Sequence, residues 1–279
     1  MKREENDALI RKHYREQADK DKDSPLSTIG ERVVREKELD LITSFIRVVT
    51  RQRRGQQVCH VLDAGCGNGY TLQKLTDSFE EVQFSGLEMT PELLQIAEAR
   101  QLKRCQLHSG DIRHAPYDDC SFDIIFTERC LINILEQKEQ LDALREIARM
   151  LKPTGYYLMI ECFNDGLENN NRARREMGLE DIAPAYHNLY FDKDALFAGT
   201  RDILAPVDPV DVDRDGGMML FPNNFLSSHY FVARVLHPLL TKGEWIRNTE
   251  FVSFFSFLPP IGNYAPVQSL VFKKRKAAG

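Results

Sequence analysis

The sequence predicts an α/β fold: a doubly wound, parallel sheet with helices on both faces. Over residues 58–163, short apolar runs of strand length alternate with longer segments in which apolar residues recur at helical spacing. A glycine-spaced turn follows the first apolar run, and acidic residues stand at the ends of the first three. Alternation of this kind specifies parallel strands that are covered by helices.

The elements of this core follow in a regular order. A first helix is expected over residues 31–51, where Val34, Leu41 and Phe45 form an apolar face. The run Thr-Pro-Glu at residues 90–92 starts another helix with an N-cap, a proline at the first position and an acid at the positive end of the dipole. Strands are expected over 58–63, 83–87, 106–109, 122–126 and 156–161, and further helices over 70–80 and 137–151.

The alternation stops after residue 163. The following segment is too long for a connecting loop, so we expect a helical cap with one sheet-packing helix over 229–240. Residues 249–257 and 267–273 are rich in β-forming residues and flank a Pro-Pro-Ile-Gly-Asn turn, which predicts an antiparallel hairpin. The expected parts are an N-terminal helical segment (1–55), the core (56–163), the cap (164–240) and a terminal hairpin that completes the sheet (241–279).

Composition restricts the class of protein. The chain has 279 residues, of which 42% are hydrophobic and 28% charged, as in ordinary globular proteins. Its net charge of −5 argues against a dedicated nucleic-acid binder. No apolar stretch is long enough to span a membrane, and the charged first residues do not form a signal peptide, so a cytoplasmic location is expected. The six cysteines contain no C-x-x-C pair, which predicts reduced thiols and no metal site.

The run Val-Leu-Asp-Ala-Gly-Cys-Gly-Asn-Gly-Tyr at residues 61–70 carries the strongest functional signal. Glycines allow a tight turn and a close approach to a ligand, and the amides of the next helix start face the bound molecule. Asp63 is expected either to order this loop or to bind a cationic amine. Glu88, at the end of the second strand, can accept both hydroxyls of a ribose, and Asp111 can accept from an adenine amino group.

With these motifs, residues 58–163 resemble the class I S-adenosylmethionine-dependent methyltransferases. The run at 61–69 resembles that family's first motif, Gly-Leu-Glu-Met-Thr at 86–90 its ribose-binding motif, and Gly-Asp at 110–111 its adenine-contacting motif. Residues 122–126 and 151–156 resemble its fourth strand and the turn before its fifth. The resemblance implies a Rossmann-like, seven-stranded sheet whose last strand is reversed, with S-adenosylmethionine as the cofactor and S-adenosylhomocysteine as the product.

The resemblance also assigns the cofactor site residue by residue. Ala64 belongs to the first motif, the glycines of the turn skirt the methionine part, Glu88 holds the ribose, Met89 and Ile112 enclose the adenine, and Thr127 to Arg129 close over the sulfonium. Tyr14 is expected to fold over the cofactor from the N-terminal segment. The full expected set is Tyr14, Asp63, Ala64, Gly65, Gly67, Gly69, Glu88, Met89, Asp111, Ile112, Thr127, Glu128 and Arg129.

The acceptor residues are expected at the strand ends and in the cap. A hydroxyl acceptor needs a general base, whereas an amine needs only its deprotonated form. His187 is the first candidate for the base and an acceptor contact, with a structural role as its alternative; Tyr190 is expected to shape the acceptor pocket. Glu161 and Asp165 are the next candidate bases. His229 is a further acceptor candidate, although core packing is favoured for it.

The expected acceptor is a hydroxyl or amine of a small molecule or a sugar. Residues 127–130 lack the D/N-P-P-Y/F run of amino-methylating DNA enzymes and the Pro-Cys of cytosine-ring enzymes. Three stretches, 170–179, 187–191 and 251–264, resemble bacterial methyltransferases of surface-polysaccharide or natural-product pathways. Two alternatives stay open: a non-catalytic protein that binds the cofactor as a regulator or scaffold, and an NAD-dependent oxidoreductase, which would carry G-x-G-x-x-G. The sequence does not predict the oligomeric state.

Overall fold

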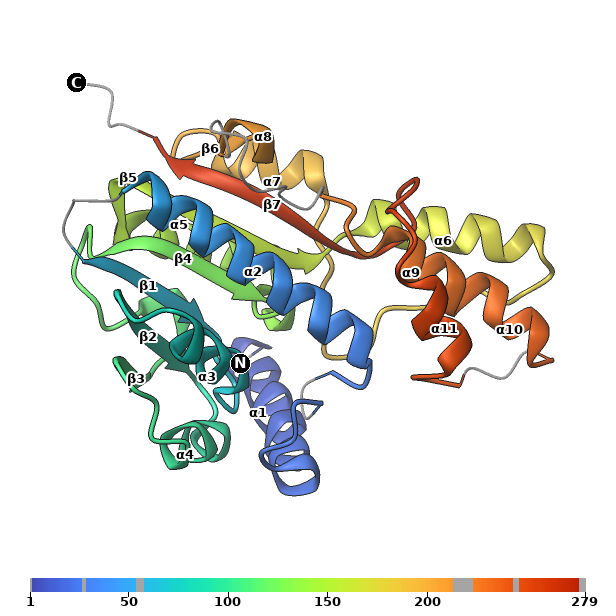
Figure 1. Cartoon of the computed structure of the whole chain (residues 1–279), viewed down its shortest axis with the longest axis horizontal. Helices are drawn as coiled ribbons and strands as arrows, with labels where there is room; N and C mark the ends of the chain where they lie inside the picture. The colour runs from blue at the N-terminus through green and yellow to red at the C-terminus, as the bar shows by residue number, and fades with distance from the viewer. Residues whose placement is uncertain (1, 27–28, 54–57, 213–222, 243–245, 276–279) are drawn as a thin grey trace.

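The computed structural model describes residues 2–26, 29–53, 58–212, 223–242 and 246–275. Seven strands form one sheet in the order β3-β2-β1-β4-β5-β7-β6 (Figure 1). The five strands β1 to β5 run parallel, and β7 is antiparallel to both of its neighbours. The strands are β1 (Cys59–Ala64), β2 (Val82–Glu88), β3 (Cys105–Ser109), β4 (Phe122–Glu128), β5 (Leu151–Cys162), β6 (Leu204–Val207) and β7 (Val267–Lys274). The predicted doubly wound, seven-stranded sheet with a reversed last strand is confirmed.

The predicted core elements form where the apolar pattern placed them. The helix α2 (Arg32–Gln52) lies across the sheet in Figure 1 and buries Leu41, Ile42 and Phe45. Burying each of these side chains stabilises the fold by roughly 1.5–3 kcal/mol. The remaining core helices are α3 (Tyr70–Ser78), α4 (Pro91–Ala99) and α5 (Gln137–Met150), with short 3₁₀ turns η1 (Ile112–His114) and η2 (Leu131–Asn133) after β3 and β4.

The predicted terminal hairpin is wrong. Residues Glu250–Phe255 form a helix, α11, whose N-cap Thr249 accepts a hydrogen bond from the Val252 amide at 3.2 Å. This cap satisfies an amide that a helix start otherwise leaves unpaired, and Val252 is buried on the helix. The partners of β7 are instead β5 and β6, so the segment expected to be only a cap also supplies the edge strand of the sheet.

Apart from the helix-free stretch 177–192, the rest of residues 164–240 that the structure describes is largely helical, as expected for a cap. It contains α6 (Asn164–Glu176), α7 (Lys193–Thr200), α8 (Pro209–Val212), α9 (Ser227–Phe231), the π-helical turn η3 (Val232–Leu236) and α10 (His237–Leu240). In Figure 1, α6, α9, α10 and α11 form a lobe beyond the ends of the central strands.

The predicted helix over 229–240 forms as a continuous helical stretch with a π-helical turn in it, but it lies in the lobe beside α6 and α11 and does not pack on the sheet as predicted. Pro238 has no amide hydrogen, so it cannot donate to the carbonyl of Arg234 four residues earlier. The Arg174 guanidinium from α6 donates to that carbonyl instead. Among the described residues, no helix is long and apolar enough to cross a membrane.

Candidate functional site

The turn after β1 requires its first glycine. Gly65 has a φ of 91°, and a Cβ at this position would lie 2.5 Å from the Cys130 Sγ. Its amide donates to the Leu87 carbonyl at 2.8 Å, and the Cys66 amide donates to the same oxygen at 3.0 Å. The backbone therefore turns tightly against β2, and the missing Cβ lets the Cys130 side chain pack directly against the turn.

Glu88 holds the glycine turn from the end of β2. One carboxylate oxygen accepts from the Gly67 amide at 2.9 Å and the other from the Thr90 amide at 2.7 Å. Burial raises the pKa of Glu88, although these amides act in the opposite direction. The carboxylate thus both orders the loop and remains part of the pocket lining.

Asp63 differs from Glu88 because part of its carboxylate has no partner. The side chain is only 2% exposed, and its Oδ1 accepts no hydrogen bond from the described residues. Burial, together with the charge of Glu128, raises the pKa of Asp63 well above its ordinary value. A buried acceptor of this kind, at the edge of a pocket, fits a cationic donor on a ligand.

Asp111 is bound by a neighbouring arginine. The Arg113 Nε lies 2.9 Å from both oxygens of the Asp111 carboxylate, and the Arg113 backbone amide also donates to it. Although burial alone would raise the pKa of Asp111, these bonds hold it below its ordinary value. Arg113 also pairs with Asp7 at 2.8 Å, which attaches the N-terminal helix α1 (Lys2–Asp21) to this end of the site.

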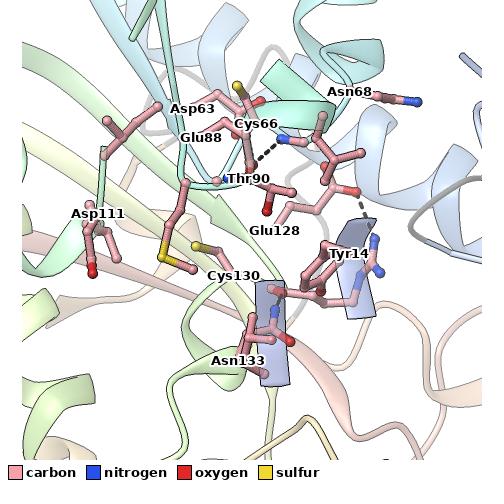
Figure 2. Close-up of a pocket in the computed structure, with 18 of the residues that line it drawn as sticks. Tyr14, Asp63, Cys66, Asn68, Glu88, Thr90, Asp111, Glu128, Cys130 and Asn133 are labelled. Carbon is pink, nitrogen blue, oxygen red and sulfur yellow. Dashed lines mark hydrogen bonds and ion pairs between the residues drawn. The ribbon is translucent and has the colours of Figure 1, made fainter. Parts of the chain in front are cut away.

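These features surround one pocket of about 1010 Å³ that is open to solvent (Figure 2). Ten of the predicted cofactor residues line it: Tyr14, Asp63, Gly65, Gly67, Glu88, Met89, Asp111, Ile112, Glu128 and Arg129.

Three predicted cofactor residues are not in that lining. Ala64 is fully buried in β1. Gly69, with a φ of 73°, lets α3 pack close to α4, because a Cβ there would lie 2.9 Å from that of Ala97. The Thr127 hydroxyl is buried and lies 2.8 Å from the Tyr157 hydroxyl. These three residues support the turn and the strand behind the pocket.

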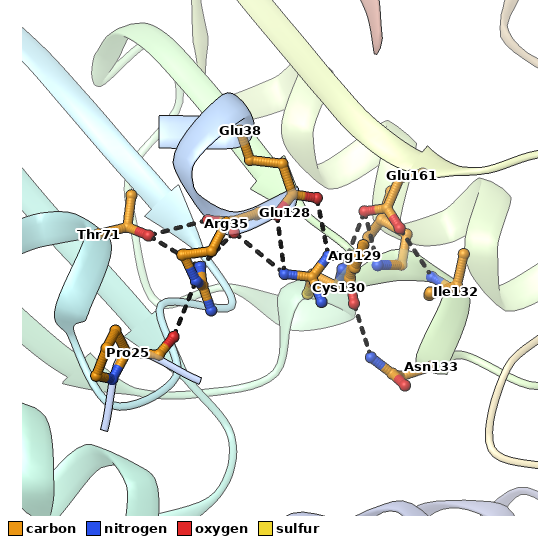
Figure 3. A network of polar contacts seen from close by, with 11 residues as sticks. Pro25, Arg35, Glu38, Thr71, Glu128, Arg129, Cys130, Ile132, Asn133 and Glu161 are labelled. Carbon is orange, nitrogen blue, oxygen red and sulfur yellow. Dashed lines mark hydrogen bonds and ion pairs between the residues drawn. The ribbon is translucent and has the colours of Figure 1, made fainter. Parts of the chain in front are cut away.

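A buried ionic network that the sequence did not reveal forms another wall (Figure 3). The Arg35 guanidinium, from α2, pairs with Glu128, and Glu128 also accepts from the Thr71 hydroxyl at 3.0 Å. Arg129 pairs with Glu128 at 3.2 Å and with the fully buried Glu38 at 2.9 Å. Although burial alone would raise the pKa of Glu128, the two arginines hold it below its ordinary value. In the sequence, this network is indicated only by the charged residues on the otherwise apolar face of α2.

Other lining residues that the sequence analysis missed come from α1 and from the turn after β4. Ile10 lies on α1, and Cys130, Asn133 and Ile134 lie around η2. The only sequence signal for Cys130, Asn133 and Ile134 is that they follow the strand whose end was already assigned to the site, and Ile10 has no such signal.

The two acidic candidates for a general base lie outside the pocket lining. Glu161 is fully buried, and its carboxylate accepts from the backbone amides of Cys130, Leu131 and Ile132 at 3.0–3.2 Å (Figure 3). Burial raises the pKa of Glu161 to about 7. Asp165 pairs with Lys193 at 2.7 Å and accepts from Gln268 and Asn263.

The cap candidates are also outside that lining, although one of them contacts α1. The ring of His187 stacks on His13 at a centroid distance of 3.8 Å, and burial lowers the pKa of His187 to about 4. Tyr190 lines a separate hollow beside α5 and α7. His229 is 3% exposed and lies 2.6 Å from the Ser256 hydroxyl and 3.2 Å from the Glu31 carboxylate, which is the packed position favoured for it.

Comparison with known proteins assigns the core of the chain. Residues 56–191 match the family model of a methyltransferase domain. A malonyl-[acyl-carrier protein] O-methyltransferase of Erwinia pyrifoliae is 33% identical over 134 residues, which are 47% of this chain and 48% of that protein. A sterol 4-C-methyltransferase of Caenorhabditis elegans is 23% identical over 189 residues, which are 65% of this chain and 55% of that protein.

A solved structure supports the same fold. The phosphoethanolamine N-methyltransferase 1 of Haemonchus contortus, in complex with phosphoethanolamine and S-adenosylhomocysteine, is 17% identical to this chain with a TM-score of 0.59. The match covers all of this chain and 51% of that one. The chain spans about half the length of the curated relatives that it matches.

Proposed function

We propose that this chain is a class I S-adenosylmethionine-dependent methyltransferase, because residues 56–191 match a methyltransferase domain, and that it transfers a methyl group to a hydroxyl or amine of a small molecule or sugar. The relatives named above include O-, C- and N-methyltransferases, so they do not fix the acceptor atom. The observation that carries the proposal is the buried, unpartnered Asp63 Oδ1 at the edge of a glycine turn.

The residues of the pocket fit S-adenosylmethionine. Asp63 supplies a buried acceptor for its ammonium group, and Glu88 retains lone pairs that ribose hydroxyls can use. Gly65 and Gly67 line the pocket beside Asp63, so the backbone of the glycine turn would lie against the amino-acid part of the cofactor. When bound, this cofactor supplies an activated methyl group on a positively charged sulfur.

The chain contributes mainly by positioning and by excluding water. The helix α1 covers the pocket with Ile10 and Tyr14, and the Asp7–Arg113 pair holds it there. The Arg35–Glu128–Arg129 network fixes another wall of the pocket with its charges already paired. A wall of fixed, mutually neutralised charges does not need to reorganise during methyl transfer.

The direct test uses cofactor that is labelled in its methyl group. Purified protein is incubated with it and a fractionated extract of small metabolites, and labelled product is measured together with S-adenosylhomocysteine. The proposal predicts equal amounts of both, and loss of both in an Asp63→Asn variant. Binding of S-adenosylhomocysteine without any turnover would favour the non-catalytic regulator instead.

A further inference from the structure

Asn133 presents an unsatisfied acceptor at one end of the pocket. It is the last residue of η2, directly after β4, and it lines the pocket beside Cys130 (Figure 2). Its Nδ2 donates to the Arg129 carbonyl at 2.9 Å, which fixes the orientation of the amide, because the flipped group would place two oxygens together. The Oδ1 is buried and accepts no hydrogen bond from the described residues. A ligand that donates a hydrogen bond would satisfy it.

Tyr14 completes this end of the pocket from α1. Its phenol interacts with the Asn133 side chain and with the charge of Arg129. Burial raises the pKa of Tyr14 above its ordinary value, so the hydroxyl stays neutral and serves as a hydrogen-bonding group and not as a base. The acceptor end of the pocket therefore offers an amide oxygen and a neutral phenol.

The described lining contains no histidine, and its carboxylates are already committed. Glu128 is bound by two arginines, Asp111 and Asp7 by Arg113, and Glu88 by two backbone amides. Asp63 is assigned to the ammonium of the cofactor in the function proposed above. A hydroxyl placed at Asn133 would thus meet no group in the described lining that takes its proton.

We propose that the acceptor is a primary or secondary amine, which donates an N–H to the Asn133 Oδ1 and directs its lone pair toward the methyl group. This inference rests on the function proposed above. The nitrogen lone pair forms the new N–C bond, the S–C bond breaks, and its electrons stay on sulfur as a neutral thioether. The nitrogen becomes a cationic ammonium, which releases a proton to water, so no protein base takes part.

The same geometry disfavours the other acceptor types. A carboxylate or phenolate would bring its negative oxygen against the Asn133 Oδ1, and the arginines of this wall are paired with Glu128 and Glu38. A tertiary amine has a lone pair but no N–H, so it would leave the Asn133 oxygen unsatisfied. The presence of one N–H on the acceptor nitrogen is thus the specific requirement of this site.

The test measures methyl transfer to matched probes and classifies each product by the chemical shift of the ¹³C-labelled methyl carbon. The probes are 2-phenylethylamine, its N-methyl and N,N-dimethyl derivatives, 2-phenylethanol and 3-phenylpropanoate. A metabolite extract is assayed in parallel with each probe. We expect N-methyl products from the primary and secondary amines, and at least about tenfold lower kcat/KM for the tertiary amine. O-methyl products as the main species, or no labelled amine at all, would contradict the proposal.

Two variants of Asn133 separate this inference from the proposed function. Asn133→Leu keeps the volume and removes the acceptor, so kcat/KM for the amines should fall about tenfold or more, while S-adenosylhomocysteine binds within about twofold of the original affinity. Asn133→Gln keeps both the amide donor and the acceptor oxygen and should retain more amine activity than the leucine variant. If the leucine variant methylates the amines with the same kcat/KM as the unmodified protein, the role of Asn133 is refuted. If the unmodified protein fails to bind S-adenosylhomocysteine, the proposed function itself is refuted.

Discussion

Replacing Asp63 by asparagine should stabilise the ligand-free protein and weaken cofactor binding. The carboxylate is buried, and its Oδ1 has no partner among the described residues. A buried polar group left unsatisfied costs about 1–3 kcal/mol, and more when it is charged. The neutral, isosteric asparagine should therefore raise the free energy of unfolding by about 1–3 kcal/mol at neutral pH.

The stabilisation by Asp63→Asn should depend on pH. Burial raises the pKa of Asp63 in the folded state well above its ordinary value of 3.8. The folded state then binds a proton more tightly than the unfolded state, so the carboxyl group lowers stability progressively as the pH rises above 3.8. The gain from Asp63→Asn should be present at neutral pH and should disappear below that value.

The same substitution removes a charge-assisted hydrogen bond to the cofactor. Such a bond is worth about 1.5–3 kcal/mol, which corresponds to a loss of roughly 10- to 100-fold in affinity for S-adenosylhomocysteine. Denaturant unfolding without ligand measures the stability, and calorimetric titration measures the affinity. A variant that is less stable without ligand but binds with unchanged affinity would refute the reasoning, because Asp63 would then serve only to order the loop.

Three further outcomes follow from the contacts around the pocket. Gly65→Ala should destabilise the protein by about 2 kcal/mol or more in denaturant unfolding. The alanine Cβ would lie 2.5 Å from the Cys130 Sγ, and the backbone φ of 91° is unfavourable for a residue with a side chain. An unchanged midpoint of denaturant unfolding would contradict this. Asp7→Asn should weaken S-adenosylhomocysteine binding by about fivefold at most, because the ion pair between Asp7 and Arg113 is partly exposed. The effect should become smaller in high salt. A loss of affinity that does not depend on salt would argue against an ionic contact. Burial lowers the pKa of His187 from 6.5 to about 4, so the stability of the protein should fall as the pH drops through this interval. Thermal unfolding of a His187→Phe variant should therefore show a flatter dependence on pH. A pH profile identical to that of the unmodified protein would count against the stacked, neutral ring.

The cofactor end of the site was predictable because its chemistry lies in short, local motifs. Glycines that must adopt a positive φ, such as Gly65, leave a direct mark on the sequence. Glu88 and Asp111 were located by their places at the ends of adjacent parallel strands, which the fold brings to one edge. Local patterns of this kind also carried the order of the core strands and helices.

The remaining contacts in and around the pocket were not predictable because they join distant segments. Arg35 and Glu128 are 93 residues apart, and the pattern of α2 does not indicate which residue its buried charge meets. The stack of His13 on His187 likewise joins α1 to the cap. The hairpin prediction failed because β-forming composition around Val252 was outweighed by a helix cap at Thr249 and by packing.

Calorimetric titration of the purified protein with S-adenosylhomocysteine, with NADH and NADPH as controls, tests the central claim most directly. The account predicts binding of S-adenosylhomocysteine alone, with micromolar or tighter affinity, and loss of that binding in a Glu88→Ala variant. No binding, or a preference for a nicotinamide nucleotide, would contradict the assignment of the pocket.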